Sequence, residues 1–342
     1  MAQAGNVLHF SGHLHLRHRL VLSILSGKAV KIDHIRSEDK NPGSKRCFAD
    51  YEVSLLRLLE RITNGTVIEI SVTGTAILLK PGVIAGGPAV IMLAPFSKRP
   101  LQLTLRGITS DDRDLSADLI RTITLPQLQL FGVSDGLELR IRKRGSPPLG
   151  GGEVQFICPS VKQLKTLDLV ERGKVKRIRG ISHAVRVNPQ FSNRMIEAAR
   201  SVLNRYIPDI YLYSDVYKGE DSGKSPGYGL SLLSETTTGA MHCAEALSQP
   251  GVAPEDIALL ATRALLQEIQ RGGCVDSHHQ ILVLLSWMGE PTARTIQFLR
   301  DVKTAFGTTF KIVPAEKIDP ASTELLYSCY GAGYVNANRT LS

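Results

Sequence analysis

The chain has 342 residues, of which 43% are hydrophobic and 21% charged, a composition that indicates a folded protein and excludes a disordered chain. Lys and Arg outnumber Asp and Glu by 41 to 32, a formal net charge of +9 at pH 7, and an excess of this sign suits nucleic acid or an acidic protein surface as partner. The 5 cysteines make no Cys-x-x-Cys pair, so we expect neither a zinc site nor a framework of disulfide bonds. This cysteine usage is typical of a protein in a reducing compartment.

The N-terminal region predicts a first folding unit. An apolar-rich segment, Leu20–Lys31, precedes a helix at Asp50–Thr63, whose apolar residues recur at helical spacing and which Asn64-Gly65 ends. Alternating apolar and polar residues then predict strands at 68–72 and 76–80. The unit therefore contains a helix followed by two strands.

The same order of elements recurs in the next segment. Leu101, Leu103 and Leu105 alternate with polar residues, as in a strand with one buried face. The elements predicted after this strand are a helix at Ser116–Ile123 stopped near Pro126, a strand over Leu137–Ile141, a Gly-rich turn over Gly145–Gly152 and a strand over Val154–Cys158.

A third copy is predicted to be split by an insert. It opens with the strand Val175–Ile181 and resumes at Gln280–Trp287. Its remaining elements are a helix at Thr295–Phe306 and strands at Thr308–Val313 and Glu324–Tyr330. The insert has helices at Phe191–Tyr206 and Pro254–Arg271 with strands near Asp209–Tyr217 and Gly229–Leu233.

This order predicts an α/β (α+β) fold of three repeated strand–helix–strand–strand units with a small inserted α/β domain. We expect the large domain at residues 1–183 and 276–342 and the insert at 184–275. The N-terminus has no signal-peptide pattern, and no apolar run is long enough to cross a bilayer. We therefore expect no membrane association.

Several local motifs resemble the RNA 3′-terminal phosphate cyclase family, over nearly the whole chain. They are similar above all to the nucleolar cyclase-like proteins of eukaryotic small-subunit ribosome assembly, which implies the fold just described. The motifs are Leu25-Ser26-Gly27-Lys28 with Asn41-Pro42-Gly43, Asp50–Ser54, the string Lys143–Val154 and Gly219–Gly227.

Three departures from the cyclase pattern imply that cyclase chemistry is lost. The family's nucleophilic His, which takes up AMP from ATP, is matched here by Pro291, and proline has no nitrogen lone pair that could attack a phosphate. The Gly-rich nucleotide loop reads Ser11–Arg17, and the adenylate contact Ala-Asp-Gln reads His278-His279-Gln280. The resemblance thus implies no ATP cofactor.

Three functions remain open from the sequence. The first is a monomeric binding module in early pre-rRNA processing toward 18S rRNA, located in the nucleolus of the nucleus. The resemblance implies a nucleolar GTPase of the small-subunit processome, the U3 snoRNP and pre-rRNA as partners. The second is a metal-independent endoribonuclease. The third is an ATP-dependent cyclase with a different nucleophile.

A basic anion-binding groove is predicted beside the Gly-rich turn. Cations there would neutralise phosphates, and glycines would let backbone N–H groups approach an anion closely; an acidic segment of the GTPase could fill the same groove. Solvated surface charge is the alternative. The candidate residues are Arg17, Arg36, Arg142, Lys143, Arg144, Gly150, Gly151, Gly152, Lys176, Arg177 and Arg179.

The nuclease candidates lie on the helix after Pro291. Helical spacing places Arg300 and Asp301 opposite the apolar stripe, with Lys303 at its edge. Asp301 could act as a general base on a ribose 2′-OH while the two cations stabilise the phosphorane. An ordinary charged helix face is the alternative.

Histidines near the N-terminus raise the question of a metal site. His13 and His15 would share one face of a strand, but no carboxylate or cysteine nearby completes a ligand set. We therefore predict a half-exposed strand and no metal.

Overall fold

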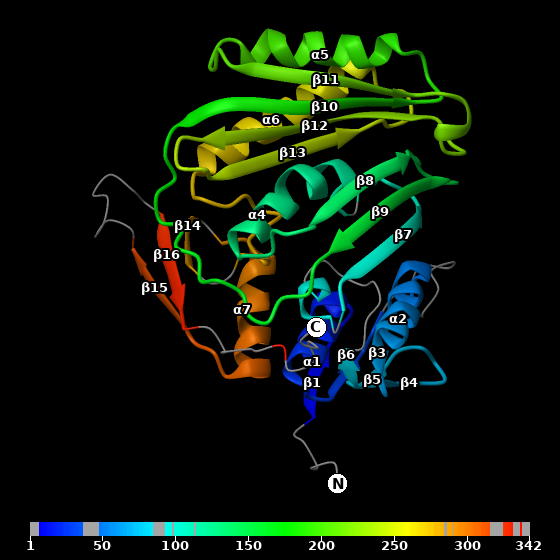
Figure 1. Cartoon of the computed structure of the whole chain (residues 1–342), viewed down its shortest axis with the longest axis vertical. Helices are drawn as coiled ribbons and strands as arrows, with labels where there is room; N and C mark the ends of the chain where they lie inside the picture. Colours follow the sequence, from blue (N-terminus) through cyan, green and yellow to red (C-terminus); the bar gives the residue numbers. More distant parts are fainter. Residues whose placement is uncertain are drawn as a thin grey trace.

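The structure is a computed structural model, and it describes residues 7–36, 48–84, 93–97, 99–112, 114–283, 286–289, 291–314, 324–330 and 336. The predicted motif Asn41-Pro42-Gly43 and Cys47 lie outside the described residues. In Figure 1 the insert forms one end of the molecule, and the first and third repeats lie together at the other end.

The first repeat builds a mixed four-stranded sheet. Its strands β2 (Val30–Asp33), β4 (Val67–Ile70) and β5 (Ile77–Lys80) pair in the order β2-β5-β4, and α2 (Asp50–Ile62) joins β2 to β4. The short strands β3 (Thr63–Asn64) and β6 (Val83–Ile84) pair beside it.

Two further elements precede this repeat. Strand β1 (Leu8–Ser11) pairs in parallel with β2, and α1 (Leu16–Ser26) connects the two. The apolar segment at Leu20–Lys31 is thus mostly helix. The predicted strand at His13–Leu16 is wrong, because His15 has a left-handed backbone (φ 63°) that ends the extended chain and starts α1.

The second and third repeats have the same topology as the first. Strands pair in the order β7-β9-β8 in one and β14-β16-β15 in the other, all antiparallel. Their strands are β7 (Leu101–Gly107), β8 (Glu138–Lys143), β9 (Gly152–Cys158), β14 (Ser286–Gly289), β15 (Phe310–Pro314) and β16 (Leu325–Cys329). The mixed fold with strand–helix–strand–strand repeats is therefore confirmed.

The helix of the second repeat is longer than predicted. It runs through α3 (Ala117–Leu119), a π-helical segment η2 (Ile120–Thr124) and α4 (Leu125–Leu130). Pro126 does not end it, because this residue lies in the first turn of α4, where a missing backbone N–H is tolerated. A 3₁₀ turn, η1 (Ala94–Phe96), precedes β7.

The prediction that residues 175–181 open the third repeat is wrong. They belong to β10 (Val175–Val185), which pairs with β11 (Ile210–Tyr217) and β12 (Gly227–Thr236) in the insert's sheet. β14 supplies the first strand of the third repeat, which precedes α7 (Ala293–Phe306), whereas residues 280–282 form a turn. The boundaries 1–183, 184–275 and 276–342 stay a prediction, and we propose that the insert begins near Val175.

The insert is a sheet with helices on one face (Figure 1). Its strand order is β11-β10-β12-β13, where β13 (Met241–Leu247) was not predicted from the sequence. Helices α5 (Gln190–Leu203) and α6 (Pro254–Arg271) cover one face through a common apolar core. A 3₁₀ turn, η3 (Gly219–Asp221), links β11 to β12.

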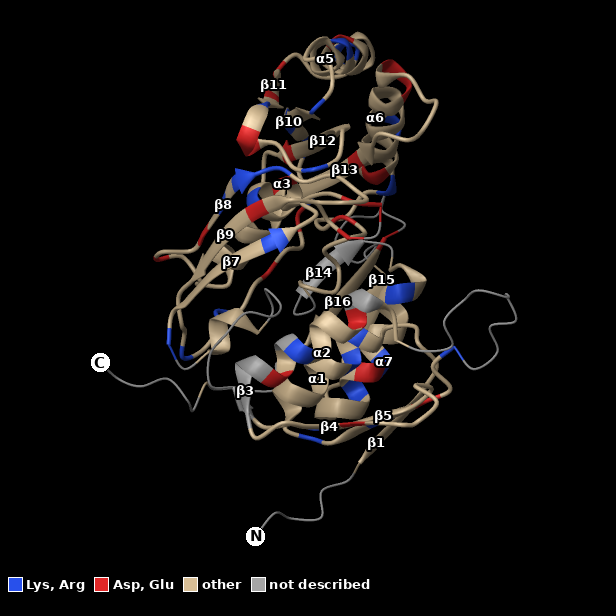
Figure 2. Ribbon diagram, turned by 90° about the vertical axis from the view of Figure 1, so that its right-hand side faces the viewer, with Lys and Arg blue, Asp and Glu red and all other residues tan. Residues whose placement is uncertain are grey.

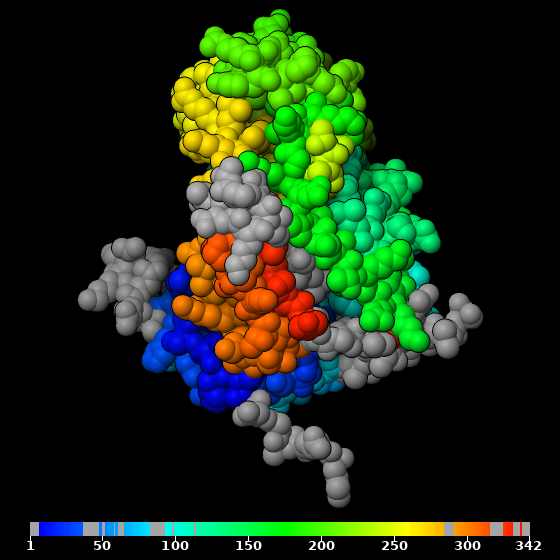
Figure 3. All heavy atoms as spheres, turned by 90° about the vertical axis from the view of Figure 1, so that its left-hand side faces the viewer, coloured from blue at the N-terminus to red at the C-terminus, as the bar shows by residue number. Residues whose placement is uncertain are grey.

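Separate cores hold these units. One core joins the first repeat to α7, another lies beneath β7, β8 and β9, and a third fills the insert. Figure 3 shows the insert seated on the rest of the molecule. Among the described residues, none of the helices combines the length and the apolar character that crossing a bilayer requires.

Candidate functional site

A small cleft lies at the start of α7. It encloses about 230 Å³ and is lined by Pro291, Thr292, Gln280, Ser277, Glu268, Arg271, Gly272 and Val275. The Gln280 side-chain oxygen accepts hydrogen bonds from the Thr292 backbone N–H (3.1 Å) and the Thr295 hydroxyl (2.6 Å). Thr292 caps α7 by accepting from the Thr295 N–H. These bonds fix the start of α7 without presenting a nucleophile from Pro291.

A buried polar cluster lies beside this cleft. His279 Nδ1 is 2.8 Å from an Asp276 carboxylate oxygen, and His279 Nε2 is 2.8 Å from the Thr124 hydroxyl. Within the described part of the chain, Cys243, Asp276 and His279 are the group whose ligand atoms lie within 4.8 Å of one another. The hydrogen bonds already account for the position of His279, and burial raises the pKa of the Cys243 thiol. This arrangement is that of a packed structural cluster.

The three nuclease candidates are not brought together. Asp301 is buried, with 2% of its surface exposed, whereas Arg300 and Lys303 are exposed. The Asp301 carboxylate accepts from Arg19 Nε on α1 at 3.0 Å and from Gln297 Nε2 at 2.9 Å. The prediction that Asp301 lies on the exposed face is therefore wrong. Its ion pair with Arg19 links α1 to α7. A buried carboxylate in such a pair is poorly placed to act as a general base on RNA.

The Gly-rich turn packs against neighbouring backbone. A Cβ at Gly145 would lie 2.3 Å from the Gly152 nitrogen, and one at Gly150 would lie 2.9 Å from the Gly107 carbonyl carbon. Gly150 and Gly151 also have positive φ values, 62° and 83°, which favour glycine. The Lys224 N–H donates to the Gly150 carbonyl (2.8 Å). These glycines thus allow two chain segments to touch, which is a structural reason for the turn.

Arg144 is the centre of a buried ion network. Its side chain is 2% exposed and donates to both Asp118 carboxylate oxygens, at 2.6 and 2.9 Å, and to Asp215. Burial alone would lower the pKa of Arg144, but the Asp118 carboxylate raises it above its ordinary value. Because Asp118 is on α3 and Asp215 on β11, the network joins the second repeat to the insert. The assignment of Arg144 to an anion-binding surface is therefore wrong.

The other predicted cations do not form one groove. Arg36 binds Glu52 with two hydrogen bonds, and Arg17, Arg177 and Arg179 pair with Asp114, Glu235 and Asp209. Lys176 and Arg177 lie near the start of β10. The Gly-rich turn that follows Arg144 lies beside Gly227, and Gly227 pairs with Val185 at the far end of β10. At about 3.3 Å per residue these ends are roughly 30 Å apart. Figure 2 shows basic and acidic residues interspersed along the chain.

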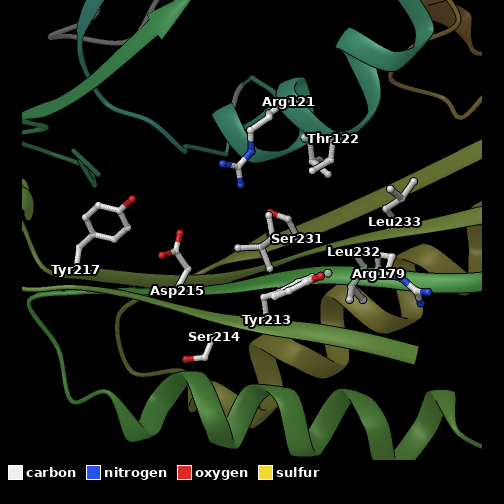
Figure 4. Close-up of a pocket in the computed structure, with 13 residues that line it drawn as sticks. Arg121, Thr122, Arg179, Tyr213, Ser214, Asp215, Tyr217, Ser231, Leu232 and Leu233 are labelled. Carbon is white, nitrogen blue, oxygen red and sulfur yellow. The ribbon is translucent and has the colours of Figure 1, made fainter. Parts of the chain in front are cut away.

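A second, larger cleft was not predicted from the sequence. It encloses about 490 Å³ between η2 and the strands β10, β11 and β12. Figure 4 shows Arg121 and Thr122 on the helical side, with Tyr213, Asp215 and Tyr217 on the strand opposite. The signal in the sequence was the alternation Tyr211, Tyr213, Asp215, Tyr217, which places all four side chains on one face of a strand.

A buried histidine, His183, and a partly buried one, His18, predict a stability that depends on pH. Burial lowers the pKa of His18 and of His183 to about 4, whereas an unfolded histidine titrates near 6.5. The unfolded chain then binds more protons between pH 6.5 and 4, so the free energy of unfolding falls by about 1.4 kcal/mol per pH unit for each fully buried histidine. This contribution is intact above pH 6.5 and is lost as the pH drops.

Urea unfolding at several pH values measures this loss. Between pH 6.5 and 4, the variant His183→Gln should reduce the slope of the free energy of unfolding against pH by the equivalent of one proton, since His183 is fully buried. His278→Gln removes an exposed imidazole and is the matched control. Equal slopes for all three proteins would contradict the assignment to His183.

The chain matches a known protein family over most of its length. The family described as RNA 3′-terminal phosphate cyclase matches residues 8–312. The chain belongs to this family. The cyclase-family resemblance predicted from the sequence motifs is thereby confirmed.

Its relatives carry cyclase-like and processing names. A probable RNA 3′-terminal phosphate cyclase-like protein of Dictyostelium discoideum is 45% identical, over 98% of this chain and 100% of its own. The RNA 3′-terminal phosphate cyclase-like protein of Homo sapiens is 44% identical over the whole of both chains. The rRNA processing protein rcl1 of Schizosaccharomyces pombe is 42% identical, over 98% of this chain and 99% of its own.

Proposed function

We propose that this family member acts in rRNA processing as a binding component and does not cyclise RNA ends. The observation that carries the proposal is Pro291, which lines a cleft at the start of α7 and which the motif resemblance matches to the family's nucleophilic His. A proline ring nitrogen within a peptide bond cannot form a phosphoramidate with AMP. A relative that is 42% identical is named an rRNA processing protein, which supports the choice of substrate.

The finer proposal concerns the ribosomal small subunit. The chain acts in early pre-rRNA processing toward 18S rRNA, in the nucleolus, together with the U3 snoRNP and a nucleolar GTPase. Support comes from the motifs shared with cyclase-like proteins of ribosome assembly, above all the string Lys143–Val154. The net charge of +9 is of the sign that such a polyanionic assembly requires.

One set of incubations tests loss of chemistry and retention of binding. Purified protein is mixed with ATP labelled at the α-phosphate, and separately with a labelled pre-rRNA fragment that spans the early cleavage sites. We expect no covalent adenylate, because Pro291 offers no nucleophile, and we expect the RNA to be bound and to stay intact. An active cyclase is the positive control for labelling.

Either of two results would overturn the proposal. A labelled adduct on the wild-type chain would mean that another residue replaces the missing His. Specific cleavage of the bound fragment that survives a chelator would restore the endoribonuclease hypothesis. In that case Arg300→Ala and Lys303→Ala are the informative variants, because both side chains are exposed and their removal leaves the fold intact.

A further inference from the structure

The insert's sheet has one face that is only partly covered. Alternate residues of β11 point to opposite faces, and Leu212 packs into the core beneath α5 and α6. On the other face, Leu119 and Ile123 pack over Cys243 on β13 with Leu233 of β12 beside them. On this face, β11 and the adjoining edge of β10 are not covered, and they form one wall of the larger cleft.

Tyrosines project from this uncovered part. Tyr211 and Tyr213 are 50% and 53% exposed, and their rings form an edge-to-face pair with centroids 4.4 Å apart. Tyr217 lies farther along the same strand, on the same face. Exposed aromatic rings on a sheet are the surface on which unpaired nucleic-acid bases stack, because every base offers a flat π-face.

Guanidinium groups stand on both sides of the cleft. Arg121 approaches from η2, and Arg179 comes from β10 within the sheet (Figure 4). Arg179 is held by Asp209 in a partly exposed ion pair, with side chains 31% and 52% exposed. Arg179 donates to both Asp209 carboxylate oxygens, but solvent screens an exposed pair, and a phosphate offers the same bidentate geometry and can replace the carboxylate. The walls therefore supply cations for a backbone beside rings for bases.

Polar groups in the cleft suit the edges of a base. The Asp215 carboxylate is 35% exposed although it also binds Arg144, and a carboxylate accepts hydrogen bonds from the amino groups of cytosine. Ser231 and Thr122 also line the cleft; their hydroxyls donate to Glu245 and to the Asp118 carbonyl, and the hydroxyl oxygens can still accept. A duplex would keep its bases stacked and paired, out of reach of these groups.

We propose that this cleft, lined by Tyr213, Arg121, Arg179 and Asp215, binds an unpaired segment of RNA together with Tyr211, whose ring packs against Tyr213 beside the cleft. Bases stack on the tyrosine pair, phosphates lie against the two arginines, and Asp215 favours a base with an exposed amino group. The inference rests on the proposed association with pre-rRNA and adds the surface that makes it. It places that surface between the insert's sheet and η2 of the second repeat, in a cleft that shares no lining residue with the one at Pro291.

Fluorescence anisotropy with the full chain tests the proposal. The probe is a labelled single-stranded RNA of about 12 nucleotides, within the range that such surfaces cover. Tyr213→Ala should weaken binding roughly 5- to 150-fold, the range for loss of one stacked base. Tyr213→Phe retains the ring and should bind within about 2-fold of wild type, because stacking requires the ring and not the hydroxyl.

Controls separate this surface from general attraction to polyanions. Tyr206→Ala removes another exposed tyrosine, 64% exposed and outside the cleft, and should bind as wild type. An RNA duplex of the same length should bind more weakly than the single strand. Ultraviolet cross-linking followed by peptide mapping should place the RNA on the segment Ile210–Tyr217.

The outcomes distinguish the two proposals. If wild type binds RNA and Tyr211→Ala and Tyr213→Ala bind equally well, the cleft is wrong while RNA binding stands. If wild type binds no single-stranded RNA, the proposed RNA association fails and the cleft proposal with it. If the tyrosine variants lose a protein partner and keep RNA, the surface serves a protein, and this proposal is overturned.

Discussion

Replacing Arg144 with Met lowers the free energy of unfolding by about 3–5 kcal/mol, the cost of leaving a buried charge without its partner. Asp118 is 1% exposed, and both of its carboxylate oxygens accept from Arg144. Burial alone would raise the pKa of Asp118, but the hydrogen bonds from Arg144 hold it below its ordinary value. Without Arg144 this carboxylate keeps, among the described residues, only the longer contact with Arg121 (3.4 Å), and it must ionise in a buried site or take up a proton.

Chemical denaturation followed by circular dichroism measures this loss. The matched control is Arg142→Met, two residues earlier on the same segment and exposed, which should change stability by less than about 0.5 kcal/mol. The double variant Arg144→Met/Asp118→Leu removes both charges of the fully buried pair and should recover much of the loss. Equal stability of the two single variants would show that Asp118 does not depend on Arg144.

Replacing Asp301 with Ala destabilises the chain by about 3–5 kcal/mol as well, because Arg19 is left buried without its carboxylate. The Arg19 side chain is 7% exposed, and it also donates to the Ser11 carbonyl at 3.0 Å and packs over the Phe10 ring. Loss of the ion pair therefore loosens α1 from α7. Thermal or urea unfolding should show the loss, whereas Arg300→Ala, an exposed neighbour, should unfold as wild type.

Variants of the Arg19–Asp301 pair also test whether Asp301 has a catalytic role. Any loss of RNA activity in Asp301→Ala is ambiguous, because that variant is expected to be poorly folded. The double variant Arg19→Met/Asp301→Leu replaces the pair with apolar side chains and should refold the interface. If wild type cleaves RNA and this folded double variant does not, Asp301 acts in the chemistry and our structural assignment is wrong.

Some elements could be predicted closely from local sequence. The helix Pro254–Arg271 has the predicted bounds, because Pro254 with two following acidic residues favours its start and Gly272 its end. The repeated order of strands and helices was also evident, since period-2 and period-3.6 patterns are local properties. The proposed departure at Pro291 rests only on the residue and on the family pattern.

Other features depend on contacts that no local pattern contains. The assignment of β10 to the insert rests on its hydrogen bonds to β11 and β12, and strand pairing is chosen among all strands of the fold. The burial of Asp301 was missed because α7 also packs against α1, through the face that carries Thr295, Phe298 and Asp301. A single apolar stripe predicts only one buried face.

The sequence by itself determined the family and the repeated units, because these depend on residue identity and on local periodicity. Only the tertiary structure decided which charged side chains remain available to a partner. Arg144 and Asp301 look like surface charges along the chain, but folding brings buried partners to them from distant segments. Long-range packing likewise left the tyrosines of β11 exposed, because α3 and η2 cover only the neighbouring strands.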